Sequence, residues 1–263
     1  QTSCYRISAI GKSCLYLRAL IMNLVAIIPA RFGSTRFPGK PLALIDGVAM
    51  IERVVKRVES AGVVSRVVVA TDDVRIEKFV QDFGGEVVMT SPSCENGTQR
   101  CLEAVSKISP KPDAVINVQG DEPFVHTDQL KELARLIQLP GASIATLAHP
   151  NKYSNEDKED INRVKVVRNL NGFAMLFSRA SIPVSEGSWL QHVGLYAYTS
   201  DVLEEIVSLK PTELEKRESL EQLRWLDHGY RIHVGLTNHK TPGVDTPEDL
   251  IKIEALLKAG ESL

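Results

Sequence analysis

Residues 25–41 read VAIIPARFGSTRFPGKP. The first four are apolar without interruption, as expected of a parallel strand that is covered on both faces. The rest is a loop rich in small residues and proline, and it carries the cations Arg31, Arg36 and Lys40. Ligands of open α/β sheets bind beyond the carboxyl ends of the strands, so this loop is the first place to look for chemistry.

The same strand-then-helix pattern continues downstream. We predict strands at 66–70, 86–89, 114–118 and 143–148, separated by helices at 49–60, 74–83, 98–108 and 127–138. Strands and helices that alternate at intervals of about 30 residues are typical of a mostly parallel, doubly wound sheet. The sequence therefore predicts a Rossmann-like α/β fold.

The second half of the chain has a different pattern. Here we predict strands at 164–167, 173–177, 193–198 and 232–236, a helix at 212–228 with a capping box at Thr212 and Glu215, and a final helix at 247–258. The sequence Asn169–Gly172 between the first two of these strands is typical of a hairpin turn. We expect one domain over residues 23–263, in which residues 149–230 contain a β-rich part.

Residues 1–22 differ from the rest, because they contain basic residues and no acidic one. Their apolar run is interrupted by Arg18 and is far shorter than the roughly 20 residues that a membrane span needs. Three interpretations remain open: a non-native addition, a transit peptide or an ordered extension.

Composition excludes several classes of protein. Lysine and arginine number 31 against 33 acidic residues, for a net charge of -2, and a nucleic-acid-binding protein normally has a basic excess. None of the four cysteines is spaced as CxxC, so neither a disulfide framework nor a structural zinc site is predicted. We expect a cytoplasmic protein with no nucleic-acid or membrane partner.

The basic loop at 31–40 suits a triphosphate, which carries about four negative charges. Glycine and serine allow the backbone to approach an anion closely, so that N–H groups can donate to phosphate oxygens. Neither the P-loop pattern nor GxGxxG is present. The alternative is a solvated basic loop with turn residues.

Two carboxylates follow later strands. Asp121 lies in NVQGDEP (117–123), and Asp245 lies in GVDTPEDL (243–250). Hard oxygen ligands of this kind suit Mg²⁺, which binds one or two carboxylates together with substrate phosphates. Thr246 is a good N-cap and Asp249 lies three residues after it, so the helix start needs no help from Asp245. The alternatives are a helix-capping acid for Asp121 and a helix-dipole partner for Asp245.

Smaller signals come from the remaining loops. Arg100 lies near the start of a helix, where it would contact a base or a phosphate, or else lie in solvent. His192 and Tyr196 are four apart on a strand and so share one face, which would either bind a polar ligand or pack in the core. No Ser-His-Asp order and no HExxH motif is present, so nucleophilic or zinc catalysis is not indicated.

Taken together, these motifs resemble one family, the 3-deoxy-manno-octulosonate (Kdo) cytidylyltransferases, also called CMP-Kdo synthetases. The resemblance covers about residues 24–258, in eight ordered motifs. They lie at 28–31, 37–42, 69–73, 97–100, 117–123, 177–183, 220–224 and 243–250.

The family implies a Mg²⁺-dependent reaction of CTP with Kdo that gives CMP-Kdo and pyrophosphate, for lipopolysaccharide synthesis in a Gram-negative cytoplasm. It also implies a homodimer that uses the β-rich part. By motif, the triphosphate would be held by Arg31 and Lys40, and the same loop would be completed by Ser34, Thr35 and Arg36. The residues near the cytosine would be Asn96, Gly97, Thr98 and Arg100, and Gln119 would lie beside the nucleotide. Asp121 and Asp245 would ligate Mg²⁺, and Arg179, His192, Tyr196, Glu221 and Gln222 would face the sugar.

The chain departs from the family at Gln99, where the family usually has glutamate. Residues 1–22 also lie outside the family pattern, and a plant homologue with a transit peptide is an open alternative. Two other functions remain open as well. One is a CMP-sialic acid synthetase, which shares the fold and the cytidylyl chemistry. The other is a nucleotide-binding protein without catalytic activity.

Overall fold

The structure is a computed structural model that describes residues 22–33, 36–151, 158–184 and 187–259. Residues 1–21 and the predicted loop residues Ser34 and Thr35 lie outside the described residues. Among the residues that are described, no helix combines the length and the apolar character that a membrane crossing requires.

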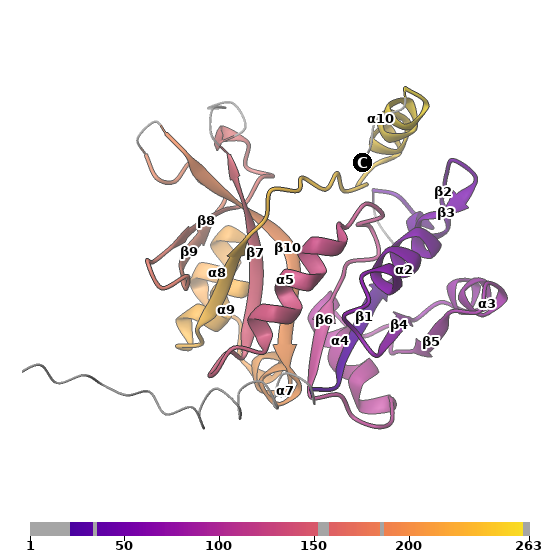
Figure 1. The fold of residues 1–263 in the computed structure, drawn as a ribbon, viewed down its shortest axis with the longest axis horizontal. Coiled ribbons are helices and arrows are strands. Elements are labelled where there is room, and N and C mark those ends of the chain that lie inside the picture. The colour runs from indigo at the N-terminus through magenta and orange to yellow at the C-terminus, as the bar shows by residue number, and fades with distance from the viewer. Residues whose placement is uncertain (1–21, 34–35, 152–157, 185–186, 260–263) are drawn as a thin grey trace, which may run out of the picture.

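A central sheet organises the molecule (Figure 1). Its strands follow the order β11 (Ile232–Leu236), β7 (Ile144–Asn151), β10 (Trp189–Thr199), β6 (Ala114–Asn117), β1 (Leu24–Ala30), β4 (Arg66–Thr71) and β5 (Glu86–Met89). Strands β6, β1, β4 and β5 are parallel, and β11 is parallel to β7, whereas β10 is antiparallel to both its neighbours. The predicted mostly parallel α/β fold is confirmed.

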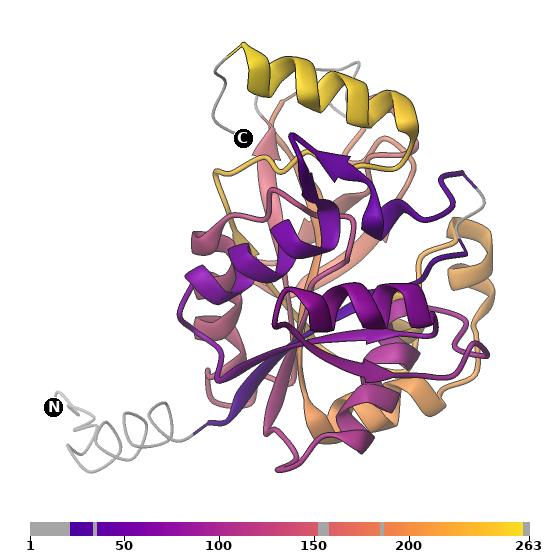
Figure 2. The same ribbon diagram turned by 90° about the vertical axis from the view of Figure 1, so that its right-hand side faces the viewer.

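Helices cover both faces of this sheet (Figure 2). The helices that were predicted from apolar periodicity are α2 (Met50–Ser60), α3 (Val74–Asp82), α4 (Gly97–Lys107), α5 (Thr127–Ile137) and α10 (Pro247–Lys258). Strand β1 is buried along its whole length: Ala26 and Ile28 pack in the cluster that contains α2, α3 and α5, while Val25 and Ile27 pack with α4. Burial on both faces explains why this strand is apolar throughout.

The predicted hairpin forms between β8 (Lys165–Arg168) and β9 (Ala174–Ser178). Asn169 accepts backbone hydrogen bonds from Asn171 and Phe173 through its side chain, and Gly172 has a φ of 82°. Within the described ranges, three short elements and one helix were not predicted: η1 (Lys40–Leu42), β2 (Leu44–Ile45), β3 (Val48–Ala49) and α7 (Ser200–Ser208). Strand β8 pairs with β10, so the hairpin extends the central sheet on one side (Figure 1).

The predicted helix over 212–228 is wrong, because two helices replace it: α8 (Glu213–Glu218) and α9 (Gln222–Asp227). The capping box at Thr212 is confirmed. Ser219 ends α8 in the left-handed conformation, with φ 52° and ψ 48°. The break turns α9 so that Leu223 and Trp225 are buried. Burial of these two side chains therefore favours two short helices over the single long helix that the apolar periodicity predicted.

Substitution of Ser219 tests this break. We expect Ser219→Val to lower the free energy of unfolding by about 1–2 kcal/mol, because a β-branched side chain is strained at positive φ. Ser219→Gly, which adopts this conformation without strain, is the control and is expected to retain stability. Urea unfolding measures both. Equal stability of the valine and glycine variants would contradict a left-handed residue here.

Candidate active site

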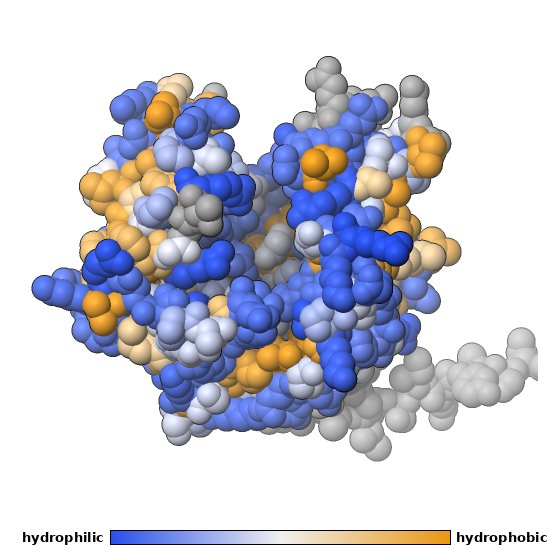
Figure 3. Space-filling model, turned by 180° about the vertical axis from the view of Figure 1, so that it is seen from behind, coloured by the Kyte–Doolittle hydropathy of each residue, from blue (hydrophilic) through white to orange (hydrophobic). Residues whose placement is uncertain are grey.

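A cavity of about 350 Å³ lies beyond the carboxyl ends of β1 and β6. From behind, the surface is hollowed between the part that carries α10 and the part that carries β8 and β9 (Figure 3). The cavity is lined by Pro29, Ala30, Arg31, Arg36, Lys40, Pro41, Cys94, Glu95, Asn96, Gly97, Arg100, Gln119, Gly120, Asp121 and Asp245. The structure thus brings together the basic loop, both predicted metal ligands and much of the predicted nucleotide site.

The basic loop is closed at its base. The Gly39 N–H donates to the Phe32 carbonyl at 2.9 Å, and the Arg75 guanidinium lies 3.3 Å from the centre of the Phe32 ring. Gly39 has a φ of 73°, and a Cβ at this position would lie 2.9 Å from that ring. Only glycine fits this close approach without displacing the ring. The closure leads directly into η1, where Lys40 is the first residue.

Lys40 joins three segments. Its ammonium lies 2.7 Å from the Asp121 carboxylate and 3.4 Å from the Asp245 carboxylate. Arg36 adds a contact of 3.3 Å to Asp245. The Lys40 side chain is only 12% exposed, so its pairing with Asp121 is less screened by solvent than a surface ion pair.

The helix-capping alternative for Asp121 is wrong, whereas the helix-dipole alternative for Asp245 stays open. The N-cap of α5 is His126, so Asp121 does not cap that helix. Thr246 and Asp249 form the predicted capping box of α10, which is confirmed. The Asp245 side chain instead points to Lys40 and Arg36.

Sequence reasoning missed Glu122 as a site residue. Its Oε2 is buried with no hydrogen-bond partner among the described residues. Burial, with the negative charge of Asp121 as the next cause, raises the pKa of the Glu122 carboxyl to about 8. The only sequence signal was its place beside Asp121. Glu122 does not line the cavity itself but lies beside Asp121, which does.

The predicted nucleotide side of the cavity, called the nucleotide side below, is built on the start of α4. Asn96 is the N-cap and accepts from the Gln99 N–H at 2.8 Å. The Gln99 side chain in turn accepts from the Glu95 N–H at 2.8 Å. A neutral amide oxygen thus provides the acceptor here, and no charge is needed at position 99. A Cβ on Gly97 would lie 3.2 Å from Gln119, so these predicted neighbours are close.

Arg100 is not solvated, so that alternative is wrong. The residue is 3% exposed, and its guanidinium lies 2.9 Å from the Asp72 carboxylate. It also donates to the Thr90 hydroxyl at 2.6 Å. Arg100 lines the cavity, and its ion-pair partner Asp72 lies just after the carboxyl end of β4. The ion pair therefore connects the first turn of α4 to the end of β4.

None of the five residues predicted to face the sugar is among the described residues that line this cavity. Arg179 donates to the backbone carbonyls of Ile161 and Glu218. Gln222 is buried in α9. Their assignment to the sugar stays a prediction, and the Arg179 contacts give it a structural role in tying β9 to α8.

Glu221 has a direct connection to the nucleotide side. Its carboxylate accepts from the Asn96 amide at 3.1 Å and from the Thr98 hydroxyl at 2.8 Å. Burial raises the pKa of this carboxyl. Glu221, which does not itself line the cavity, therefore orients the residues at the start of α4.

His192 and Tyr196 lie together, as their spacing predicted. Their ring centroids are 5.4 Å apart, and Tyr196 packs edge-on against Trp225 at 5.3 Å. His192 Nε2 lies 3.0 Å from the Thr146 hydroxyl. Desolvation lowers the pKa of the His192 imidazole from 6.5 to about 3, so the ring is neutral at neutral pH. Both the core-facing and the ligand-facing interpretation of Tyr196 remain, because the ring is buried beside a partly exposed histidine.

Comparison with known proteins gives consistent results. A family profile described as cytidylyltransferase matches residues 25–232. The 3-deoxy-manno-octulosonate cytidylyltransferases of Porphyromonas gingivalis and Parabacteroides distasonis are 48% and 47% identical to this chain, over 90% of its length and 97% and 99% of theirs. The chain belongs to the 3-deoxy-manno-octulosonate cytidylyltransferase family.

Solved structures support the same family. One described as CMP:2-keto-3-deoxy-manno-octonic acid synthetase complexed with CTP has a TM-score of 0.86 and 40% identity, over 91% of this chain and all of that one. A 4-diphosphocytidyl-2C-methyl-D-erythritol synthase from Anaerococcus prevotii has a TM-score of 0.60 at 15% identity and shares the fold. The cytidylyltransferase motifs recognised in the sequence are therefore carried on the expected fold.

Desolvation of the partly exposed His192 ring predicts a specific acid sensitivity for this cytidylyltransferase family member. Its pKa is about 3 in the folded state and near 6.5 when unfolded. Between these values the unfolded state binds a proton that the folded state does not, so stability falls as the pH falls. We expect a loss of up to about 1.4 kcal/mol per pH unit below pH 6.

His192→Gln retains a polar partner for Thr146 but does not titrate. Urea unfolding of the wild type and this variant between pH 7 and pH 4.5 measures the difference in slope. The wild type is expected to lose stability more steeply. Parallel curves for the two proteins would contradict a neutral, desolvated His192.

Proposed function

We propose that this protein transfers a cytidylyl group from CTP to Kdo, giving CMP-Kdo and pyrophosphate for lipopolysaccharide synthesis in a Gram-negative cytoplasm. The observation that carries the proposal is the convergence of Lys40, Asp121 and Asp245 at one end of a cavity in a fold shared with a CTP-bound synthetase. The named activity of relatives that are almost half identical supports the same substrates.

The basic loop accounts for the CTP side. Arg31, Arg36 and Lys40 all line the cavity, and the first two are exposed. Positive charges around a triphosphate stabilise the negative charge on the phosphoryl group during transfer. Asn96 and Arg100 line the other part of the cavity, where the proposal places the cytosine. The anomeric hydroxyl of Kdo attacks the α-phosphorus, and pyrophosphate leaves.

Mg²⁺ is the proposed cofactor, with Asp121 and Asp245 as its ligands. The donors fit this ion, because carboxylate oxygens are hard ligands and Mg²⁺ favours one or two of them beside substrate phosphates. The Lys40 ammonium already lies between these two carboxylates, whereas the buried Glu122 carboxyl, with a pKa of about 8, is neutral at neutral pH and adds no charge. When bound, such an ion lowers the pKa of a coordinated hydroxyl. Lys40 holds the two aspartates close together, which orients them toward a common point.

The β-rich part within residues 149–230 is proposed to bind Kdo and to form a homodimer. Arg179, His192, Tyr196, Glu221 and Gln222 are the proposed sugar-facing residues, and Glu221 would link the sugar to the nucleotide side through Asn96 and Thr98. The hairpin carries exposed apolar residues, of which Leu170 is fully exposed and Met175 is 63% exposed. Burial of these side chains would favour a dimer.

One assay tests the function. Pyrophosphate release from CTP is measured with Kdo, with N-acetylneuraminate and with neither acid, each with and without Mg²⁺. The proposal expects release with Kdo and Mg²⁺ only. Release with N-acetylneuraminate instead would favour a CMP-sialic acid synthetase, and no release under any condition would favour a non-catalytic nucleotide-binding protein.

Asp245→Asn tests the proposed metal ligand. The amide keeps the size of the side chain but removes the charge, so we expect turnover to fall on the order of a hundredfold or more. Stability is expected to change by less than about 1 kcal/mol, because the Thr246–Asp249 capping box still starts α10. Pyrophosphate release across a Mg²⁺ titration and the melting temperature are the two measurements.

The matched control is Glu248→Gln, which removes an exposed negative charge in the first turn of the same helix. It is expected to retain wild-type turnover. If Asp245→Asn kept the wild-type rate and Mg²⁺ requirement, Asp245 would not be a metal ligand.

A further inference from the structure

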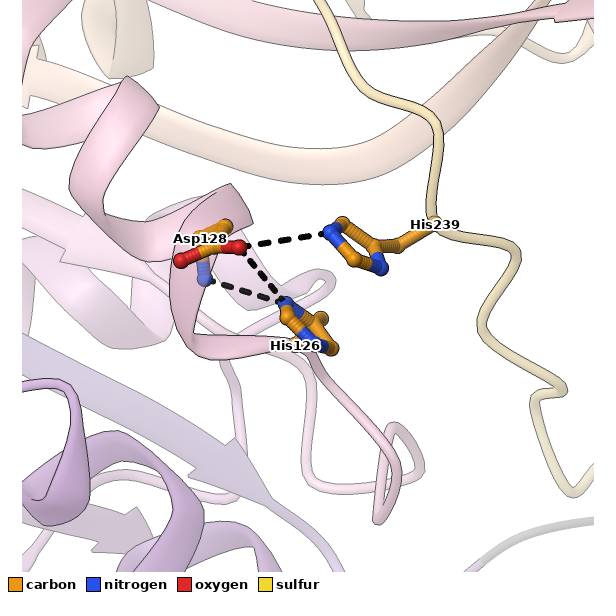
Figure 4. Close-up of side chains that lie close together, drawn as sticks. All are labelled: His126, Asp128 and His239. Carbon is orange, nitrogen blue, oxygen red and sulfur yellow. Dashed lines mark hydrogen bonds and ion pairs between the residues drawn. The ribbon is translucent and has the colours of Figure 1, made fainter. Parts of the chain in front are cut away.

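A group of three side chains of the types that ligate metal ions lies outside the cavity. His126, Asp128 and His239 each direct one ligand atom toward the others, and these three atoms lie within 4.8 Å of one another (Figure 4). His126 is the N-cap of α5 and Asp128 lies in its first turn, while His239 lies in the extended segment after β11. None of the three lines the cavity described above.

The distances are close to those of a coordination shell. Asp128 Oδ2 lies 3.4 Å from His239 Nε2 and 3.7 Å from His126 Nδ1. Ligand atoms of a tetrahedral zinc ion lie about 3.3 Å apart, because each bond is about 2.0–2.1 Å long. The two imidazole rings are stacked, with centroids 3.4 Å apart and an interplanar angle of 9°. The parallel rings would have to tilt toward each other for both nitrogens to bind one ion, because the lone pair of each nitrogen lies in the plane of its ring.

The other contacts of these three residues do not block the atoms that would bind an ion. Lys131 pairs with Asp128 through Oδ1, so Oδ2 faces the imidazoles. His126 Nδ1 accepts from the Asp128 N–H at 3.2 Å as the N-cap of α5, and a bound metal ion would replace this hydrogen bond. The backbone N–H of His239 donates to the Thr237 hydroxyl at 3.2 Å and does not involve the ring.

A buried glutamine holds the two histidine segments together. Gln129 is 1% exposed; its side-chain oxygen accepts from the His126 N–H at 3.0 Å, and its amide donates to the His239 carbonyl at 3.2 Å. One side chain thus fixes the backbone of both histidines from beneath. Fixed backbones are what a metal site needs, because its ligands must be positioned before the ion binds.

We propose that His126, Asp128 and His239 form a binding site for a divalent transition-metal ion of the Zn²⁺ class, with water completing its coordination. Imidazole nitrogens favour zinc, cobalt, nickel and copper, whereas Mg²⁺ favours oxygen ligands, so this site is chemically distinct from the carboxylates at the cavity. The ion would connect the segment that follows Asp121 with the segment that precedes Asp245. This inference does not depend on the proposed function.

Binding of Zn²⁺ to the purified full chain tests the site. Zinc is titrated against a chromophoric chelator in the presence of excess Mg²⁺, which occupies carboxylate sites, and Co²⁺ absorption in the visible range reports nitrogen ligands. We expect one equivalent of Zn²⁺ to be retained by the wild type and to raise its melting temperature by binding the folded state.

Three variants remove ligands with little effect on the fold. His126→Asn keeps a favourable N-cap for α5 but removes the imidazole, and His239→Gln and Asp128→Asn remove the other two ligands. Each is expected to weaken the retained equivalent more than about tenfold and to reduce its stabilisation by zinc. Melting temperatures without metal establish that each variant is folded.

His228→Asn is the matched control, because it removes an exposed histidine from the end of α9. It is expected to bind zinc like the wild type. The proposal would be overturned if the wild type retained no zinc equivalent, or if His126→Asn and His239→Gln retained it with unchanged affinity and Co²⁺ spectrum. Equal weakening in the control and in these variants would also overturn it.

Discussion

The ion pair between Lys40 and Asp121 is the contact on which the site depends. It joins the loop after β1 to the loop after β6 at 2.7 Å. The contact is possible because β1 and β6 are adjacent and parallel, with Ile27 opposite Asn117, so both loops leave the sheet at the same edge. Asp245 reaches the same lysine from the segment after β11. A single ammonium therefore holds together carboxylates that would repel one another without a cation between them.

Strand β10 joins the two sides of the proposed active site. It runs antiparallel between β6 and β7, and Tyr196 lies opposite Asn117. Its aromatic side chains pack against Trp225 of α9, and Glu221, which precedes this helix, binds Asn96 and Thr98 at the start of α4. A displacement on the proposed sugar side would thus be transmitted to the nucleotide side through hydrogen bonds rather than through the sheet alone.

Much of the fold could be predicted because its elements carry local signals. The apolar run of β1, the periodicity of α2 to α5 and the capping boxes at Thr212 and Thr246 each indicated an element that the structure contains. The break at Ser219 could not be predicted, since nothing in its residue type indicates positive φ and the break is set by the burial of Leu223 and Trp225.

The candidate site was predictable only in part, for a related reason. The basic loop and both aspartates were identified because each follows a predicted strand. The contacts of the aspartates with Lys40 then followed from the fold. The orphaned Glu122 oxygen and the pairing of Arg100 with Asp72 depend on tertiary burial, which sequence spacing does not contain. The stacking of His126 on His239 is likewise a long-range contact between segments with no shared pattern.

The central claim is that Asp121 and Lys40 act as one unit that binds CTP together with a divalent cation. The most direct test is calorimetric titration of CTP into the wild type and Asp121→Asn, across a range of Mg²⁺ concentrations. The account predicts that Mg²⁺ strengthens CTP binding to the wild type and has little effect on the variant, which keeps Lys40 for the triphosphate. The same Mg²⁺ dependence in both proteins would contradict it.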